Sequence, residues 1–157
     1  MKLENIMTKK VYSLHSSNTI KDAVILMKNK NIGCIPITDN DNRLKGIITD
    51  RDIIIALANG KELKNPLDEI MTKHVEVLYP NDSLVDLTET MGYYQIRRVP
   101  IVDYDDKLIG IVSLGDLSLM TFNDTLASEA LAEISYNPTK SGTNSYLYDI
   151  WSDFVEF

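Results

Sequence analysis

The sequence of 157 residues contains a single cysteine, no long apolar run and no excess of positive charge. Cys34 has no second cysteine with which to form an internal disulfide, which fits a reducing compartment. The longest apolar run, residues 53–58, is far shorter than the ~20 residues that a helix needs to cross a bilayer. The first residues show no apolar segment typical of a secretory signal. We therefore expect a cytoplasmic protein with no membrane partner.

The charge distribution argues against a nucleic-acid partner. The net charge is −7; residues 1–120 contain 17 acidic and 15 basic residues, whereas residues 121–157 contain six acidic residues and only Lys140. Binding to a phosphate backbone requires a clustered positive surface. A nearly neutral body followed by an acidic segment therefore predicts no binding to nucleic acid.

Sets of residues for catalysis or metal binding are also missing from the sequence. His15 and His74 are not spaced with other metal ligands, and no serine or cysteine nucleophile set can be assembled. Residues 39–41 begin like a calcium loop, but Arg43 and Leu44 occupy positions where a ligand and a glycine are required. We expect a hairpin turn there, no bound metal, no cofactor and no enzymatic activity.

The strongest feature that is present is an internal repeat. Residues 6–9, Ile-Met-Thr-Lys, return at 70–73, and this shift of 64 positions continues without gaps to Asp52 and Asp116. Such a repeat indicates one supersecondary unit built twice. Two copies are expected to pack about a pseudo-twofold axis, with clefts between them of the kind that bind small molecules.

Each copy predicts a β-α-β-β-α unit, so the fold class is mixed α/β (α+β). In the first copy we expect a strand at 11–14, a helix after a cap within 16–19, strands at 34–38 and 44–49, and a helix at 50–58. In the second copy we expect strands at 99–102 and 108–113 and a helix from 114. The predicted domains are 1–62 (repeat 1), 63–121 (repeat 2) and 122–157 (a C-terminal acidic tail), with a linker at 61–69.

The tail differs from the repeats in composition. It holds seven of the twelve aromatic residues, including the only tryptophan, Trp151. Residues 125–134 predict a helix. Solvated disorder is poor in aromatic residues, so we expect the tail to pack on its own module or on a partner subunit. The alternative is a mobile acidic tail.

The motif with the most binding chemistry is a strand that ends in a hydroxyl residue, followed three positions later by a carboxylate. Thr49 and Asp52 form it in the first copy, and Ser113 and Asp116 form it in the second. A hydroxyl at a helix N-terminus can help to bind phosphate, and a carboxylate can accept both hydrogen bonds of a ribose diol. The same pattern is also a capping box, which needs no ligand. Two copies at the same place favour a site, but the capping alternative stays open.

These motifs resemble those of the CBS domain. The resemblance rests on Ile-Met-Thr at the start of each copy, on residues 35–39 and 99–103 around the prolines, and on Gly-Ile-Ile-Thr-Asp-Arg-Asp at 46–52. Residues 3–120 are similar to a tandem CBS pair, the Bateman module, as in stand-alone bacterial-type proteins. The resemblance implies binding of an adenosine-containing ligand, such as AMP, ADP, ATP, S-adenosylmethionine or an NAD species, in the clefts between the repeats.

The resemblance also implies a set of nucleotide-binding residues. Thr49, Asp52, Ser113 and Asp116 match the phosphate and ribose contacts of the family. The opening segments and middle strands match the base pocket, and they contribute Thr8, Lys9, Val11, Ile35, Pro36, Thr72, Lys73, Val75, Val99 and Pro100. One cleft is expected to join residues 8–11 and 33–37 to Ser113 and Asp116. The other is expected to join residues 72–75 and 97–101 to Thr49 and Asp52.

Arg97 and Arg98 make the two clefts unequal, because the matching positions of the first copy hold a glycine and a cysteine. Arginine favours phosphate through paired hydrogen bonds, whereas Asp50, beside the hydroxyl residue of the first copy, opposes it. In the alternative interpretation, the arginines lie at a solvated edge and pair with Asp105 or Asp106.

The sequence thus predicts a regulatory protein that senses an adenine nucleotide and passes this state to an effector protein not identified by the sequence. Apolar helix stripes predict a homodimer; they contain Ile53, Ile54, Leu57, Leu117 and Met120. The alternative is a ligand-free scaffold for dimerisation or protein interaction, in which both hydroxyl–carboxylate turns are only helix caps.

Overall fold

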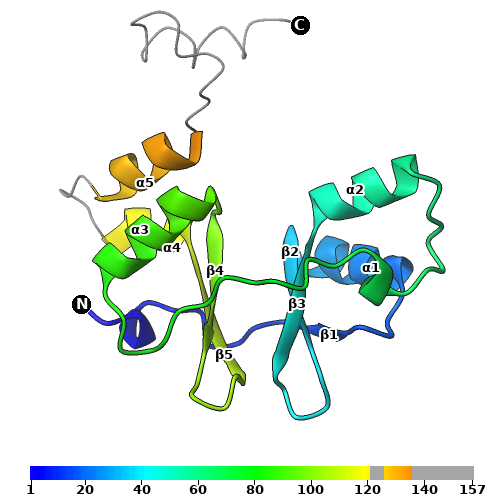
Figure 1. Ribbon diagram of the computed structural model, residues 1–157, viewed down its shortest axis with the longest axis horizontal. Helices are drawn as coiled ribbons and strands as arrows, with labels where there is room; N and C mark the ends of the chain where they lie inside the picture. Colours follow the sequence, from blue (N-terminus) through cyan, green and yellow to red (C-terminus); the bar gives the residue numbers. More distant parts are fainter. Residues whose placement is uncertain (121–125, 136–157) are drawn as a thin grey trace, which may run out of the picture.

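The computed structural model describes residues 1–120 and 126–135, and it shows two α/β halves side by side with their helices on the outer flanks (Figure 1). The first half contains η1 (Leu3–Asn5), β1 (Leu14–His15), α1 (Ile20–Lys30), β2 (Cys34–Thr38), β3 (Leu44–Thr49) and α2 (Asp50–Ala58). The second contains η2 (Leu67–Glu69), α3 (Leu84–Tyr94), β4 (Arg98–Val102), β5 (Leu108–Ser113), α4 (Leu114–Met120) and α5 (Leu126–Ser135). Among these described helices, none has the length and hydropathy to span a bilayer.

An antiparallel hairpin forms the centre of each sheet. β2 pairs with β3 from Cys34 opposite Thr49 onward, and β4 pairs with β5 from Arg98 opposite Ser113. The equal registers follow from the sequence repeat. The mixed α/β fold is confirmed, as are the strands predicted at 34–38, 44–49 and 108–113 and the helix at 50–58.

The strand predicted at residues 11–14 is wrong for most of its length. Only Leu14 and His15 pair with β2, in parallel. In the second half the equivalent pairing is reduced to a bridge between Leu78 and Ile101. The residues before Leu14 cannot extend this sheet because they cross to the other half of the molecule.

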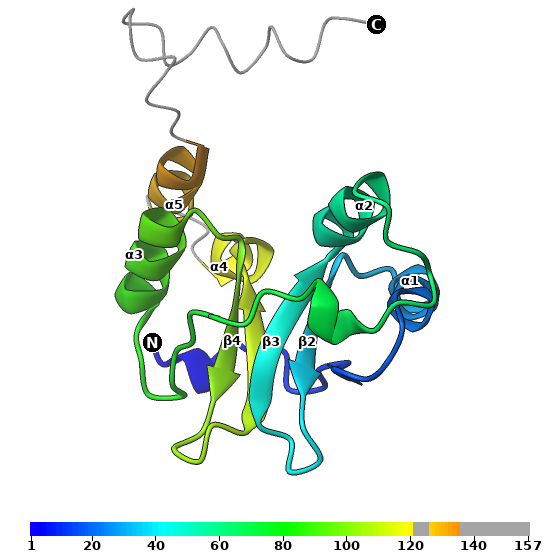
Figure 2. The same cartoon turned by 45° about the vertical axis from the view of Figure 1, so that its right-hand side comes forward.

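The two halves exchange their opening segments. The Thr8 N–H donates to the Ile111 carbonyl at 2.9 Å, and the Ile111 N–H donates back at 3.1 Å. Ile47 and Thr72 exchange the equivalent two bonds, both at 2.9 Å. Each opening segment therefore adds to the edge of the other half's β3 or β5 (Figure 2).

The same exchange is visible in the two hydrophobic cores. Leu3 of η1 is fully buried in the core of the second half, with Leu87 and Met91. Leu67 of η2 is fully buried in the core of the first half, with Ile20. The segment at 61–69 is therefore more than a linker, since it supplies a core residue to the preceding repeat. The domain boundaries stay a prediction.

The hairpin turns meet on the pseudo-twofold axis. The Leu44 N–H donates to the Asp106 carbonyl at 3.0 Å, and the Leu108 N–H donates to the Asn42 carbonyl at 2.9 Å. Asn42 and Asp106 both have left-handed backbones, with φ of 63° and 62°, a conformation that short polar side chains tolerate. The axis expected from the repeat thus passes between two matching turns.

α5 packs on the second half, beside α3 and α4 (Figures 1 and 2). Ala130 is fully buried in the same core as Leu87 and Met91. The helix predicted at 125–134 is therefore confirmed, and this part of the tail packs on its own module. The other aromatic residues singled out for the tail lie outside the described residues; they are Tyr146, Tyr148, Trp151, Phe154 and Phe157.

Two residues assigned to an apolar interface stripe belong instead to the cores. Ile53 is 4% exposed and Leu117 is fully buried, because both face their own sheets. Ile54 and Leu57 are exposed, as expected for a surface stripe. The side chain of Met120 lies outside the described part of the structure.

Candidate functional site

Both hydroxyl–carboxylate turns form capping boxes at the ends of β3 and β5. The Thr49 hydroxyl and N–H both donate to Asp52 Oδ2 at 2.7 Å, and the Asp52 N–H donates to Thr49 Oγ1 at 3.3 Å. The Ser113 hydroxyl and N–H donate to Asp116 Oδ2 at 2.7 and 2.8 Å. In each aspartate the second oxygen, Oδ1, accepts no hydrogen bond from the described residues. That oxygen is available to a ligand while the box stays intact.

The capping box by itself does not identify a site. Thr19 with Asp22, and Ser83 with Asp86, form the same box at the starts of α1 and α3. Neither of these pairs is among the residues expected from the sequence to bind a ligand. What distinguishes Thr49 and Ser113 is their position at the ends of β3 and β5, next to the segments that cross between the halves.

The exchanged opening segments bring some of the expected residues together. Thr8 lies beside Ile111, two residues before Ser113 in β5. Thr72 lies beside Ile47, two residues before Thr49 in β3. This arrangement agrees with the expected combination of each opening segment with the hydroxyl–carboxylate turn of the other repeat. Lys9, exposed, and Val11, half-buried, follow Thr8 on the same crossing segment.

The middle strands contribute less to a cleft than expected. Ile35 and Val99 are fully buried within the cores of their own halves, so their side chains face away from any inter-repeat cleft. Pro36 and Pro100 alternate with them along the strands and therefore face the opposite side of each sheet. Both prolines are buried.

Arg97 and Arg98 line a cavity of about 620 Å³ together with Ser113. This follows from the register, which sets Arg98 opposite Ser113. Neither arginine forms an ion pair with a carboxylate in the described ranges. The alternative pairing with Asp105 or Asp106 is wrong, because those residues lie in the hairpin turn at the far end of β4.

The charge of Arg98 in the second half also affects Cys34 in the first half, which is the strand partner of Thr49. Burial raises the pKa of the Cys34 thiol to about 11, and the Arg98 charge opposes this rise while Asp52 and Asp50 add to it. Arg98 of the second half thus lies within electrostatic range of Cys34 in the first half. Its grouping with Thr49 and Asp52 in one cleft stays a prediction. Cys34 itself is buried, as expected for a small core residue.

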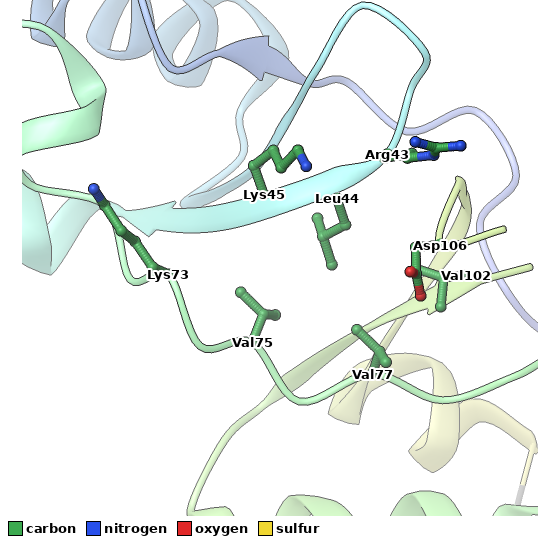
Figure 3. Close-up of a pocket in the computed structure, with 8 residues that line it drawn as sticks. All are labelled: Arg43, Leu44, Lys45, Lys73, Val75, Val77, Val102 and Asp106. Carbon is green, nitrogen blue, oxygen red and sulfur yellow. The ribbon is translucent and has the colours of Figure 1, made fainter.

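A second cavity of about 200 Å³ opens under the crossing segment that follows Thr72 (Figure 3). Lys73 and Val75, both expected at the site, line it. The remaining lining residues were missed; they are Arg43, Leu44, Lys45, Val77, Val102 and Asp106. The positive charge of Lys45 could have been noticed in the sequence, because the matching position of the second copy holds an isoleucine.

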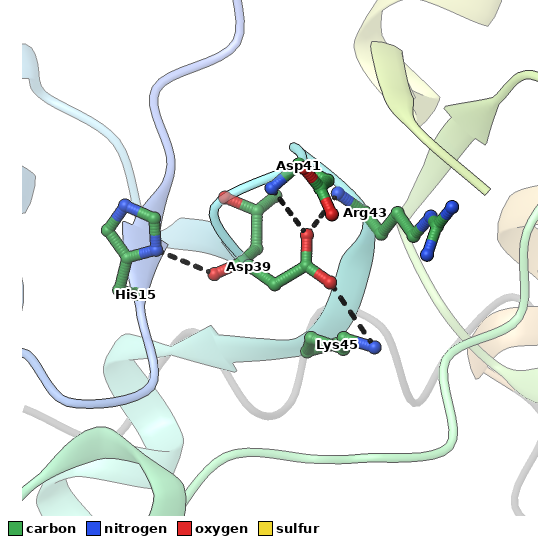
Figure 4. Close-up of polar contacts among 6 residues, drawn as sticks. His15, Asp39, Asp41, Arg43 and Lys45 are labelled. Atoms are coloured by element: carbon green, nitrogen blue, oxygen red, sulfur yellow. Dashed lines mark hydrogen bonds and ion pairs between the residues drawn. The ribbon is translucent and has the colours of Figure 1, made fainter. Parts of the chain in front are cut away.

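The calcium-like sequence at 39–41 is a hairpin turn, as predicted (Figure 4). Asp39 Oδ1 accepts the N–H groups of Asp41 and Arg43 at 3.0 and 2.9 Å, and Lys45 lies 3.4 Å from Oδ2. These contacts, led by the Arg43 N–H, lower the pKa of Asp39. His15 is exposed and its ring contacts the Thr38 carbonyl. Within the described ranges no group of His, Cys, Asp and Glu could hold a metal.

Two α/β halves with exchanged opening segments and paired hairpin turns define a tandem-repeat module. The family model for the CBS domain matches residues 3–59 and 67–119, and the chain belongs to this family. It is 39% identical over 135 residues to the CBS domain-containing protein YhcV of Bacillus subtilis, covering 85% of this chain and 95% of YhcV.

Solved structures of CBS pairs share the fold. One is the CBS domain pair of protein MJ0100 in complex with 5-methylthioadenosine and S-adenosyl-L-methionine, with a TM-score of 0.72 and 32% identity over 78% of this chain and 96% of that one. Another is CBSX2 in complex with AMP, with a TM-score of 0.71 and 25% identity over 77% of this chain and 96% of that one.

Proposed function

We propose that this chain is a regulatory module that binds an adenosine-containing ligand between its two CBS repeats. The observation that carries the proposal is the pair of turns at Thr49–Asp52 and Ser113–Asp116, each with one carboxylate oxygen left outside its capping box. Such an oxygen can accept a ribose hydroxyl without loss of the cap. The AMP, S-adenosylmethionine and methylthioadenosine complexes of similar CBS pairs support this ligand class.

The exchanged segments give a physical route from binding to regulation. A ligand seated beside Thr8 or Thr72 touches a segment whose preceding residues lie in the core of the other half. Binding that prefers one packing of the halves shifts the population toward that packing. The module acts in the cytoplasm as a homodimer and passes this state to an effector protein. It needs no catalytic group of its own.

The four capping boxes of this chain provide a matched experiment. Asp52→Asn and Asp116→Asn remove a charged acceptor at the proposed site, and Asp22→Asn and Asp86→Asn remove one from the same box elsewhere. We expect the first two to weaken AMP binding, measured by calorimetry, by about 1.5–3 kcal/mol. The second two should leave AMP affinity unchanged.

The specific rival is a ligand-free scaffold, which the identical boxes at Thr19 and Ser83 favour, since no ligand explains those. Under this rival all four aspartate variants lose some helix stability, and none changes a binding isotherm. Equal AMP affinity across the four variants and the parent would therefore replace the nucleotide-binding proposal with the scaffold.

A further inference from the structure

α5 docks on the second half at a glycine of α3, and the first half has no glycine at the matching position. Gly92 of α3 lies under Glu133 of α5, where an added Cβ would come within 2.9 Å of Glu133 Cβ. The absence of a side chain at Gly92 therefore permits the close approach of the two helices. The matching position of the first copy holds Lys28, which is exposed. A helix like α5 could not dock there in the same way.

The docked helix forms one wall of the cavity at Arg97 and Arg98. Ala127, Ser128 and Leu131 of α5 face the same space as the two arginines. Ser113 and Ser118 contribute further hydroxyl groups, and Leu114 adds apolar surface. The cavity therefore combines two guanidinium groups, three hydroxyl groups and apolar walls.

This composition fits a phosphorylated small molecule. The two arginines have no carboxylate partner in the described part of the chain, although the protein as a whole carries a charge of −7. Guanidinium groups bind phosphate through paired, charge-assisted hydrogen bonds. The Ser113 and Ser118 hydroxyls already donate to Asp116 Oδ2 and to the Gly115 carbonyl. The Ser128 hydroxyl is therefore the one of the three that can donate to a phosphate oxygen. Leu114 and Leu131 offer contacts to an uncharged part of the same ligand.

We propose that a phosphorylated ligand binds in this cavity between Arg97, Arg98 and α5, so that ligand occupancy and α5 docking stabilise each other. The proposal deepens the proposed function, because it assigns a phosphate-dependent response to the second repeat and names α5 as the element that carries it. A ligand that contacts docked α5 must favour docking by the same factor by which docking favours the ligand. The first repeat, with Lys28 in place of Gly92, has no such response.

Hydrogen–deuterium exchange on the full chain tests the linkage, with AMP and inorganic pyrophosphate as separate probes. We expect each probe to slow amide exchange in residues 126–135. Gly92→Leu, which displaces α5, should speed exchange there and weaken both probes about fivefold or more. Lys28→Leu is the matched control on α1, and it should leave exchange in 126–135 and both affinities unchanged.

Ser128→Ala keeps the test decisive if Gly92→Leu disturbs folding. The serine is exposed and alanine suits a helix, so α5 should stay docked while each probe binds about three- to tenfold more weakly. AMP binding that leaves exchange in 126–135 unaltered would overturn the role of α5 and spare the proposed function. Protection of residues 126–135 by pyrophosphate without AMP binding would support the role of α5 and overturn the proposed function. Failure of both probes to bind would overturn both.

Discussion

Gly110 and Met7 explain physically why two motifs far apart in the sequence occur together. Met7 of the Ile-Met-Thr segment packs directly on Gly110 of β5, and Met71 packs on Gly46 of β3, where a Cβ would lie 2.8 Å from the sulfur. Each methionine belongs to one repeat and each glycine to the other. The two signatures are therefore the two sides of one contact, made twice.

Gly110→Ala should consequently destabilise the fold. The added methyl group overlaps Met7 in a closely packed position, and overpacking of this kind costs about 1–3 kcal/mol. The free energy of unfolding in urea measures the loss. Gly115→Ala is the control, because its added Cβ meets only the Ser113 hydroxyl, at an ordinary 3.5 Å. Equal stability of both variants would contradict the proposed contact.

Arg97 and Arg98 allow a prediction about ligand charge. Arg97→Ala or Arg98→Ala should weaken ATP more than adenosine, because the lost guanidinium acts on phosphate. Calorimetric titration of both ligands measures the difference. Arg51→Ala on the exposed surface of α2 is the control, since Arg51 lines no cavity described above. Equal losses for ATP and adenosine would instead show that the arginines shape the fold.

At the scale of elements, the hairpins and helices could be predicted because their signals are local. Alternating apolar residues, polar turns and capping boxes set β3, β5 and α2 to the residue. The opening segments could not be predicted, because Val11 and its neighbours carry a strand-like pattern but cross to the other half. Only the long-range partners Thr8–Ile111 and Thr72–Ile47 determine that path.

The candidate site also has a part that the sequence predicts and a part that it does not. The turns at Thr49 and Ser113 follow from sequence spacing and from family resemblance. The α5 wall at Arg97 depends on the contact of Gly92 with Glu133, residues whose separation in sequence gives no local signal. Ile35 was expected in the base pocket because the strand was assigned as a whole, whereas its alternation sends that side chain into the core.

The helix caps predict a response to acid. Hydrogen bonds from Ser83 lower the pKa of Asp86, and those from Thr19 lower the pKa of Asp22, both below the ordinary 3.8. The stabilisation is therefore present above pH 3.8 and is lost as pH falls through the lower folded-state pKa. The melting temperature of Asp86→Asn should be lower than that of the parent at pH 7, and this difference should shrink below pH 3.8.

The matched control for the cap is Asp41→Asn in the exposed hairpin turn. The Asp41 side chain accepts no hydrogen bond from the described residues, so its melting temperature should follow that of the parent at every pH. A gap between Asp86→Asn and the parent that persists unchanged into strong acid would contradict the proposed role of the ionised cap.

At the scale of the whole molecule, the two flanks differ. α5 covers part of the second half, although Val85 of α3 and Leu119 of α4 stay exposed, and no such helix covers α1 and α2 in the described ranges. Ile25, Ile54 and Leu57 are exposed there, with Ile54 at 67%. Exposed apolar patches of this kind are typical of subunit interfaces. A homodimer joined through the first repeat would cover this surface and leave α5 accessible.

Ile54→Lys should therefore produce a monomer in light scattering, because burial of an unpaired charge disrupts an apolar interface. Val85→Lys is the control on α3, where the side chain is similarly exposed at 51%, and it should stay dimeric. A monomeric parent protein would contradict the homodimer, and a dimeric Ile54→Lys variant would move the interface elsewhere.

The most direct test of adenosine sensing is calorimetric titration of the full chain with AMP, adenosine and GMP, supported by melting curves. A ligand that binds the native state raises the melting temperature, and the rise grows with the logarithm of the ligand concentration above its Kd. We expect saturable AMP binding, weaker adenosine binding and the smallest response to GMP. A flat response to AMP, ATP, S-adenosylmethionine and NAD at millimolar concentrations would contradict the account.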